Sequence, residues 1–233
     1  MNLPIRIRTA AALVLLASAP AMADTATEPF RSRGNEPFWS LYMNPDRIVF
    51  APMEGEPVTV TPVPAGRRDG NATTYEASAG GGPFRLTVAD TVCTDSMSGM
   101  PFPKTVTVVL GAETFSGCGG EPAALLIGDW MISAIDGKPP VPHSTPNIAF
   151  DAEGRLSGGG SCNRFFGSYA LSGEGLTIAE TGSSMMACDA PLMTQERAIL
   201  DILEGVGRFE IGADGGLILH DHEGRTLSAR PLA

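Results

Sequence analysis

Four cysteines are the residues of this chain whose type and spacing most clearly point to chemistry: Cys93, Cys118, Cys162 and Cys188. Cysteines that bind zinc usually include closely spaced pairs such as Cys-X-X-Cys, and this chain has none. In an exported protein, an even number of cysteines indicates disulfides. Four cysteines allow three pairings. The simplest pairing joins Cys93 to Cys118 and Cys162 to Cys188.

Hydrolytic chemistry would need an activated serine beside a histidine and an acid. Ser98 and Ser161 are the candidate nucleophiles, but neither lies in a Gly-X-Ser-X-Gly motif. The glycine run at 158–160 lacks the lysine of a phosphate-binding loop, so it is interpreted as flexible backbone before Cys162. The sequence therefore predicts no catalytic residues, no bound cofactor and no enzyme activity.

Two groups of residues could bind a metal ion. His220 and His222 would share one face of a strand, where two imidazoles could hold Zn²⁺, Cu²⁺ or Ni²⁺. However, Gly224 indicates a turn and no third ligand is identifiable, so a solvated hairpin end is favoured and no metal site is predicted. Methionines could bind Cu(I), but packing in the core beside a disulfide is favoured for Met97, Met100, Met185, Met186 and Met193.

The N-terminus has the organisation of a secretory signal. A basic start precedes an apolar run over residues 9–19, and the small-residue triplet 21–23 resembles a cleavage site. The apolar run is far shorter than the roughly 20 residues that span a bilayer as a helix. We therefore expect cleavage after Ala23, a periplasmic location and no transmembrane segment in the mature protein.

The charge of the chain argues against nucleic acid as a partner. The chain has 16 basic and 26 acidic residues, a net charge of −10. Removal of residues 1–23 takes away two arginines and no acid, which leaves 14 − 26 = −12. Nucleic-acid affinity depends largely on lysine and arginine neutralising phosphates. We expect instead an unidentified protein, peptide or small-molecule ligand.

Short apolar stretches separated by turn residues predict a mainly β protein of two small antiparallel domains. After a flexible lead-in over residues 24–33, the first domain covers residues 34–121. Its expected strands are residues 38–43, 47–50, 58–63, 73–77, 84–88, 104–110 and 114–118. The stretch 58–63 contains Pro62 and is expected at a sheet edge.

The second domain, residues 124–233, is expected to add a helix to its strands and so to be α+β. Its strands are expected at residues 130–135, 147–150, 155–158, 169–171, 176–179, 208–211, 217–220 and 225–229. Apolar residues recur at helical spacing at positions 199, 202, 203 and 206. Asp189 is the expected N-cap and Gly205 the expected end. This helix should pack on the sheet.

An ordered set of residues in the second half consists of Trp130, Gly160, Asn163, Phe166, Gly167, Tyr169, Met186 and Glu196. This set resembles the META domain, the module of the heat-inducible HslJ proteins. The resemblance covers residues 124–233. It implies a compact β-rich fold with a helix against the sheet, a role in the cell envelope or in stress tolerance, and no catalysis. Within the set, Asn163 is expected to satisfy backbone groups rather than to do chemistry.

The first half carries the sequence Gly-Asn-Glu-Pro-Phe-Trp at 34–39, Cys-Thr-Asp-Ser-Met-Ser at 93–98, Pro103 and Gly-Cys at 117–118. These pieces resemble a family of uncharacterised bacterial envelope domains. The half is also similar in outline to the small β-barrel inhibitors of lysozyme, with Tyr75 in a strand and a terminal cysteine. An exported binding or protective factor is therefore the expected function. Lysozyme inhibition and metal binding are the alternatives.

Overall fold

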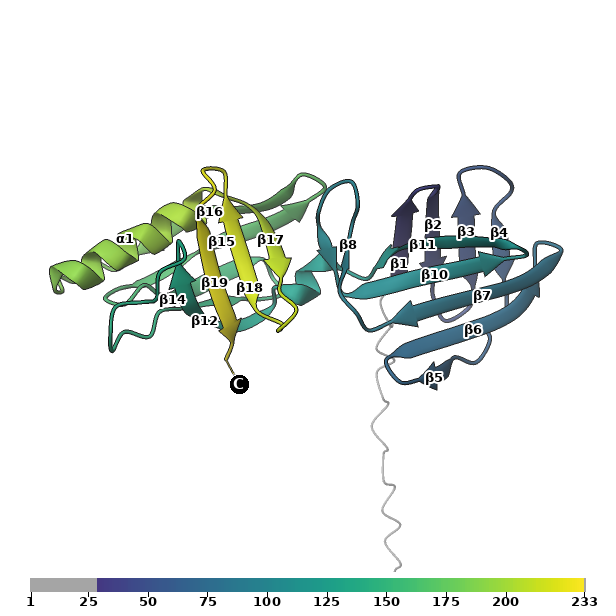
Figure 1. Cartoon of the computed structure of the whole chain (residues 1–233), viewed down its shortest axis with the longest axis horizontal. Helices are drawn as coiled ribbons and strands as arrows, with labels where there is room; N and C mark the ends of the chain where they lie inside the picture. The colour runs from purple at the N-terminus through teal and green to yellow at the C-terminus, as the bar shows by residue number, and fades with distance from the viewer. Residues whose placement is uncertain (1–28, 233) are drawn as a thin grey trace, which may run out of the picture.

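The computed structural model describes residues 29–232, so the expected signal at 1–23 lies outside the described residues. Two large antiparallel sheets dominate this part of the chain, one in each half (Figure 1). Within residues 29–232 there is no helix with the length and apolar character to cross a bilayer. The expectation of a mainly β fold with one helix in the second half is confirmed.

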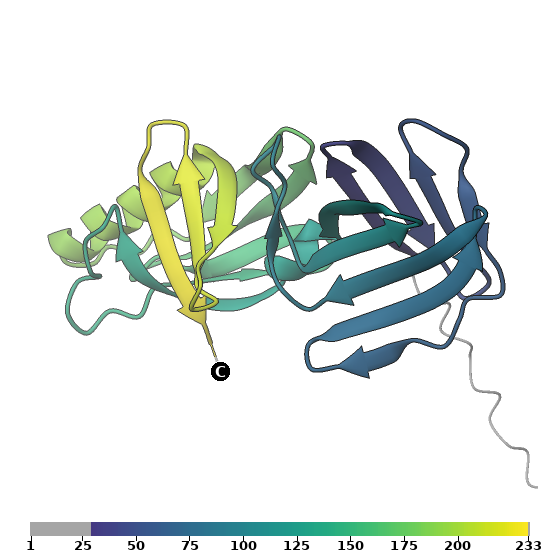
Figure 2. The same ribbon diagram turned by 45° about the vertical axis from the view of Figure 1, so that its right-hand side comes forward.

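The first sheet has nine strands in the order β4-β3-β2-β1-β11-β10-β7-β6-β5. Its strands are β1 (Phe30–Asn35), β2 (Phe38–Met43), β3 (Ile48–Pro52), β4 (Val58–Val60), β5 (Arg67–Asp69), β6 (Ala72–Ala79), β7 (Gly82–Ala89), β10 (Lys104–Leu110) and β11 (Glu113–Gly119). Figure 2 shows the sheet curving on itself. Alternate residues therefore face an enclosed core in which Phe50 contacts Trp39, Phe84 and Phe115.

The second sheet has eight strands in the order β16-β15-β14-β13-β12-β19-β18-β17. They are β12 (Gly128–Ile135), β13 (Asn147–Phe150), β14 (Arg155–Gly159), β15 (Arg164–Ser172), β16 (Gly175–Ser183), β17 (Val206–Ile211), β18 (Leu217–Asp221) and β19 (Thr226–Pro231). The expected strands in this half all form, and β15 and β16 are much longer than expected. The helix α1 (Ala190–Glu204) lies at the end of this unit away from the first sheet (Figures 1 and 2).

The helix begins and ends where the sequence predicts. Asp189 occupies the N-cap position and Gly205 follows the last turn, although the Asp189 side chain makes no capping hydrogen bond. Ile199, Ile202 and Leu203 are buried in the core of the second unit. The apolar stripe therefore packs on the sheet as expected.

A small hairpin of the first half and a short helix between the halves lie where the two halves meet. The hairpin pairs β8 (Cys93–Thr94) with β9 (Pro101–Phe102), and the helix is the 3-10 turn η1 (Pro122–Leu125). Met100, Phe102 and Cys118 belong to the first half of the chain, yet they are buried in the core of the second unit. This hairpin therefore packs the two halves against each other.

The flexible lead-in expected over residues 24–33 is wrong from Phe30 onward. Residues 30–35 form β1, which pairs with β2 on one side and with β11 on the other. Ser32 and Gly34 are buried, whereas Arg31 and Arg33, which alternate with them along the strand, are exposed. Two arginines among small polar residues resemble a loop in the sequence. Their alternation with buried residues is the strand signal.

Candidate functional site

The family residues of the second half converge on a buried hydrogen-bond network. The Asn163 amide nitrogen donates to Glu196 Oε1 at 2.8 Å, and the Asn163 backbone N–H donates to Glu196 Oε2 at 2.6 Å. The Asn163 amide oxygen accepts from the Ser184 hydroxyl at 2.8 Å and from the Met186 backbone at 2.7 Å. Asn163 therefore satisfies neighbouring polar groups, as expected. Its side chain joins α1 to the chain before the helix.

The neighbouring side chain of α1 holds a second loop. Gln195 is buried, and its oxygen accepts from the Val141 backbone at 2.6 Å. Its nitrogen donates to the hydroxyls of Ser144, at 3.1 Å, and Ser161. The proline-rich loop and the glycine loop are thereby fixed to one face of the helix. The candidate nucleophile Ser161 is held in this structural contact.

Both predicted disulfides are present. Cys93 pairs with Cys118 and Cys162 pairs with Cys188, and they close loops of 25 and 26 residues. The first lies at the hairpin between the halves. The second ties the loop between β14 and β15 to the segment before α1, beside the network of Asn163.

The glycine run at 158–160 provides space rather than flexibility, which corrects the expectation. A Cβ atom at Gly158 would lie 2.2 Å from the Asn147 carbonyl oxygen, and one at Gly160 would lie 2.6 Å from Glu196 Cγ. The residue with left-handed backbone in this loop is Ser161, at φ 108°. Gly158 and Gly160 are therefore needed because β13 approaches the first closely and α1 approaches the second.

Most of the remaining family residues have structural contacts. The Trp130 indole donates to the Leu126 carbonyl at 2.8 Å. The Tyr169 hydroxyl donates to the Asp151 carbonyl at 2.5 Å, and burial followed by the nearby acidic groups raises the pKa of this tyrosine. A Cβ atom at Gly167 would crowd the neighbouring strand β16. Phe166 is 61% exposed, and its ring lies over Gly182 of β16, where a Cβ atom would be 2.8 Å from it.

The other chemistry candidates are not brought together. The Ser98 hydroxyl donates to Asp95 at 2.8 Å, so this serine caps a turn. His220 lies beside Arg208 and Glu210, whereas His222 is exposed and packs over Gly207. No cluster of three or more histidine, cysteine, aspartate or glutamate side chains suited to a metal occurs among residues 29–232.

The expected core packing of the clustered methionines is wrong for four of the five. Only Met100 is buried. The exposed ones are Met97, Met185, Met186 and Met193. Met185 and Met186 lie in the segment before α1, which is held by hydrogen bonds between the Met186 backbone and Asn163 rather than by burial of its side chains. Tyr75, which carried the likeness to lysozyme inhibitors, packs against the core of the first sheet.

A cleft of about 780 Å³ lies between the two halves. One wall is the outer face of β1, β2 and β3, with Arg31, Arg33, Ser40 and Tyr42.

The other wall of the cleft is formed by Tyr169 and Leu171 of β15 together with the tight turn that follows. The hairpin residues Met100 and Phe102 close it from the side, and Glu121 lies at the start of η1. A volume of this size accommodates a small-molecule ligand.

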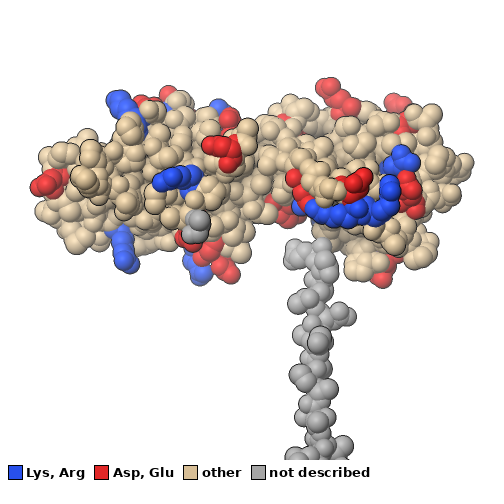
Figure 3. All heavy atoms as spheres, turned by 60° about the horizontal axis from the view of Figure 1, so that its bottom comes forward, with Lys and Arg blue, Asp and Glu red and all other residues tan. Residues whose placement is uncertain are grey.

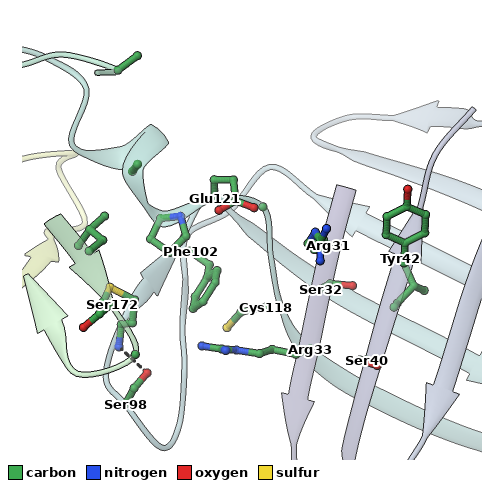
Figure 4. Close-up of a pocket in the computed structure, with 18 of the residues that line it drawn as sticks. Arg31, Ser32, Arg33, Ser40, Tyr42, Ser98, Phe102, Cys118, Glu121 and Ser172 are labelled. Carbon is green, nitrogen blue, oxygen red and sulfur yellow. Dashed lines mark hydrogen bonds between the residues drawn. The ribbon is translucent and has the colours of Figure 1, made fainter. Parts of the chain in front are cut away.

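The two arginines of the cleft lie over aromatic rings. The Arg31 guanidinium carbon is 5.7 Å from the centre of the Tyr42 ring, and that of Arg33 is 5.2 Å from the centre of the Phe102 ring. Figure 4 shows Arg33 extending from β1 toward Phe102. Such stacking orients a guanidinium while leaving its N–H donors at the ring's edge available. These residues were not predicted from the sequence, in which the alternation of arginines with buried residues in β1 is their signal.

Several basic side chains of the surface are paired with acidic ones. On the face shown in Figure 3, some basic side chains lie close to acidic ones and others stand apart from them. Arg85, for example, binds Glu76 at 2.7 Å, and Arg155 binds Asp151 at the same distance. Of the two cleft arginines, Arg33 lies 3.8 Å from Asp95, whereas Arg31 has no carboxylate of residues 29–232 within 4.0 Å.

The family comparison covers the second half of the chain, and the structural comparisons cover a similar share. A solved structure of a protein from Burkholderia xenovorans is 28% identical, covers 48% of this chain and 89% of its own, and has a TM-score of 0.40. A second solved protein is 27% identical. The match covers 48% of this chain and 95% of that protein, with a TM-score of 0.40. A DUF4847 family protein from Bacteroides vulgatus ATCC 8482 is 15% identical. The match covers 47% of this chain and 95% of that protein, with a TM-score of 0.35.

No curated protein matches this chain. The family model of the META domain matches residues 123–232, which contain the Asn163–Glu196 network, the Cys162–Cys188 disulfide and the helix. The second half of this chain is therefore a META domain.

Proposed function

We propose that this protein is an exported binding factor that acts without catalysis in envelope maintenance or stress tolerance. Its ligand binds in the cleft between the halves. The observation that carries the proposal is the cleft itself, a space of about 780 Å³ lined by oriented arginines and aromatic rings. Cavities that combine apolar walls with a few polar groups are the usual sites for small ligands.

Export is supported by the two disulfides. Disulfides persist in oxidising compartments and are rare in the cytosol. Both pairs close within one half of the chain, so each can form while that half folds. Together with the basic and apolar residues at 1–23, they favour a periplasmic location.

A role without catalysis is supported by the engagement of the polar side chains in the family motif. Asn163, Glu196 and Gln195 are buried and are hydrogen-bonded to backbone groups of neighbouring loops. These contacts use the acceptors and donors that a reacting group would need. The motif therefore serves to hold the META domain together, and ligand recognition is assigned to the cleft outside it.

The test is to fill the cleft without disturbing the core. Ser40 is exposed on β2 and lines the cleft, so Ser40→Trp places a large ring in the ligand's space. Ser78→Trp is the matched control, because Ser78 is also an exposed serine of a strand and lies outside the cleft. Native mass spectrometry of the protein from the periplasm should detect a bound small molecule in wild type and Ser78→Trp, and none in Ser40→Trp.

The same two variants are then compared in a strain that lacks the wild-type gene. Under heat or detergent stress, Ser78→Trp should restore survival and Ser40→Trp should not. Equal survival with both variants, at equal protein levels, would show that the cleft is not the functional site.

A further inference from the structure

We propose that the cleft recognises a carboxylate attached to an apolar body, and that Arg31 and Arg33 bind the carboxylate. This inference rests on the proposed function, since it assigns a ligand class to the same cleft. Fatty acids and short apolar peptides with a free C-terminus share this chemistry.

The charges that line the cleft favour an anion. Two arginines and one glutamate line it, and the buried Asp95 lies 3.8 Å from Arg33, so Arg31 is the cleft arginine without a carboxylate of residues 29–232 within 4.0 Å. The two arginines lie two positions apart on β1, which places their side chains on the same face of the strand. A negative ligand group is therefore attracted to this wall of an otherwise acidic protein.

The arginines keep hydrogen-bond donors available for a ligand. Arg33 lies 3.8 Å from Asp95, which is too far for a hydrogen bond. The Asp95 oxygens already accept from the Ser98 hydroxyl and backbone, and from the Asn35 amide. Although burial acts to raise the pKa of Asp95, these hydrogen bonds lower it below the usual value. The forked guanidinium groups match the two oxygens of a carboxylate.

The rest of the cleft suits an apolar body. Met100 and Phe102 come from the hairpin, and Leu171 comes from the opposite wall. The Tyr169 hydroxyl is already bound to the Asp151 carbonyl, so the surface that this residue offers to the cleft is mainly its ring. A bare inorganic anion would leave this apolar surface uncovered. A ligand with both parts would cover it and bind more tightly.

The test uses two acids and their uncharged counterparts. Dodecanoate represents the fatty acids, and acetyl-Leu-Phe represents the peptides. Each is compared with its own amide by isothermal titration calorimetry on the mature full-length protein, and inorganic phosphate is included as the anion without an apolar body. At least one acid should bind, at least about tenfold more tightly than its amide and than phosphate, because a charge-assisted pair and the apolar contact are both made. The acid that binds identifies the source.

Variants then assign the carboxylate site. Arg31→Gln combined with Arg33→Gln should weaken binding of that acid at least about tenfold. Arg85→Gln removes an exposed arginine outside the cleft and should leave binding within about twofold. The proposal is overturned if neither acid binds, if amide or phosphate binds as tightly as the acid, or if the double variant binds like wild type.

The two proposals fail in different ways. If an acid binds, is blocked by Ser40→Trp, and is unaffected by replacing both arginines, then the cleft is a ligand site but the carboxylate assignment is wrong. If Ser40→Trp restores survival as well as Ser78→Trp does, the proposed function fails whatever the acids do.

Discussion

Reversing the donor and acceptor in the buried Asn163–Glu196 pair tests whether this contact stabilises the META domain. Glu196→Gln alone would place an N–H group against the Asn163 amide nitrogen, because its remaining oxygen is held by backbone N–H groups at 2.6 and 3.3 Å. Asn163→Asp alone would place two carboxylates against each other. The double variant restores one donor and one acceptor, with the direction of the hydrogen bond reversed.

The expected magnitudes follow from these contacts. A hydrogen bond to a charged group contributes about 1.5–3 kcal/mol, and an unsatisfied buried group costs about 1–3 kcal/mol. Each single variant loses this hydrogen bond and leaves a buried group unsatisfied, so each should lower the free energy of unfolding by about 2.5–6 kcal/mol. The double variant loses the bond from the Asn163 amide to the Met186 carbonyl, at 3.2 Å, which is worth about 1 kcal/mol, and a carboxylate oxygen then faces that carbonyl. The neutral amide of Glu196→Gln also accepts more weakly from the backbone N–H groups of Cys162 and Asn163.

The measurement is urea denaturation of the oxidised mature protein at pH 7, followed by circular dichroism. The control is Ser184→Ala, which removes one neutral hydrogen bond to Asn163 and should cost about 1 kcal/mol. The double variant should be at least about 1 kcal/mol more stable than either single variant. A double variant that is less stable than both would refute the role given to this pair.

Three further predictions concern the same unit. Gly158→Ala should destabilise the protein by about 1–3 kcal/mol, because its Cβ would lie 2.2 Å from the Asn147 carbonyl oxygen, whereas Gly173→Ala has no neighbour within 4 Å and should change the Tm little. Replacing Cys162 and Cys188 together by serine should cost about 3–4 kcal/mol, since a loop of 26 residues opens, and urea denaturation of the pair variant measures this. Burial acts to raise the pKa of Asp221, but its hydrogen bonds from Arg225 outweigh burial and lower the pKa. The stabilisation from Asp221 is therefore present above the unfolded-state pKa and is lost as the pH falls below about 4, so the Tm of wild type should fall more steeply there than that of Asp221→Asn.

The sequence was sufficient for elements whose signal is local. The helix was predicted from the apolar stripe of Ile199, Ile202 and Leu203, and β10 and β13 were predicted to the residue from apolar stretches between turns. Both disulfides followed from the signs of export and from cysteine spacing. In each case a short stretch of sequence, or a simple count, determines the structure.

The features that depend on distant contacts were not predictable in the same way. The Asn163–Glu196 network joins residues 33 positions apart, so only the family resemblance hinted at it. The strand β1 was missed because its arginines hide the alternation with Ser32 and Gly34. The cleft depends on how two sheets pack against each other. No periodicity within one half of the chain encodes that arrangement.

The burial of Met100, Phe102 and Cys118 in the core of the second unit has a consequence for how this protein can be divided or recombined. A META domain separated at residue 122 would lose three side chains from its interior and would expose the apolar surface that they cover. Joining it to a different N-terminal domain would require that domain to supply replacements of similar size. The halves are therefore not interchangeable modules, and substitutions in the hairpin between them are expected to coevolve with the interior of the META domain rather than with the sheet from which the hairpin extends.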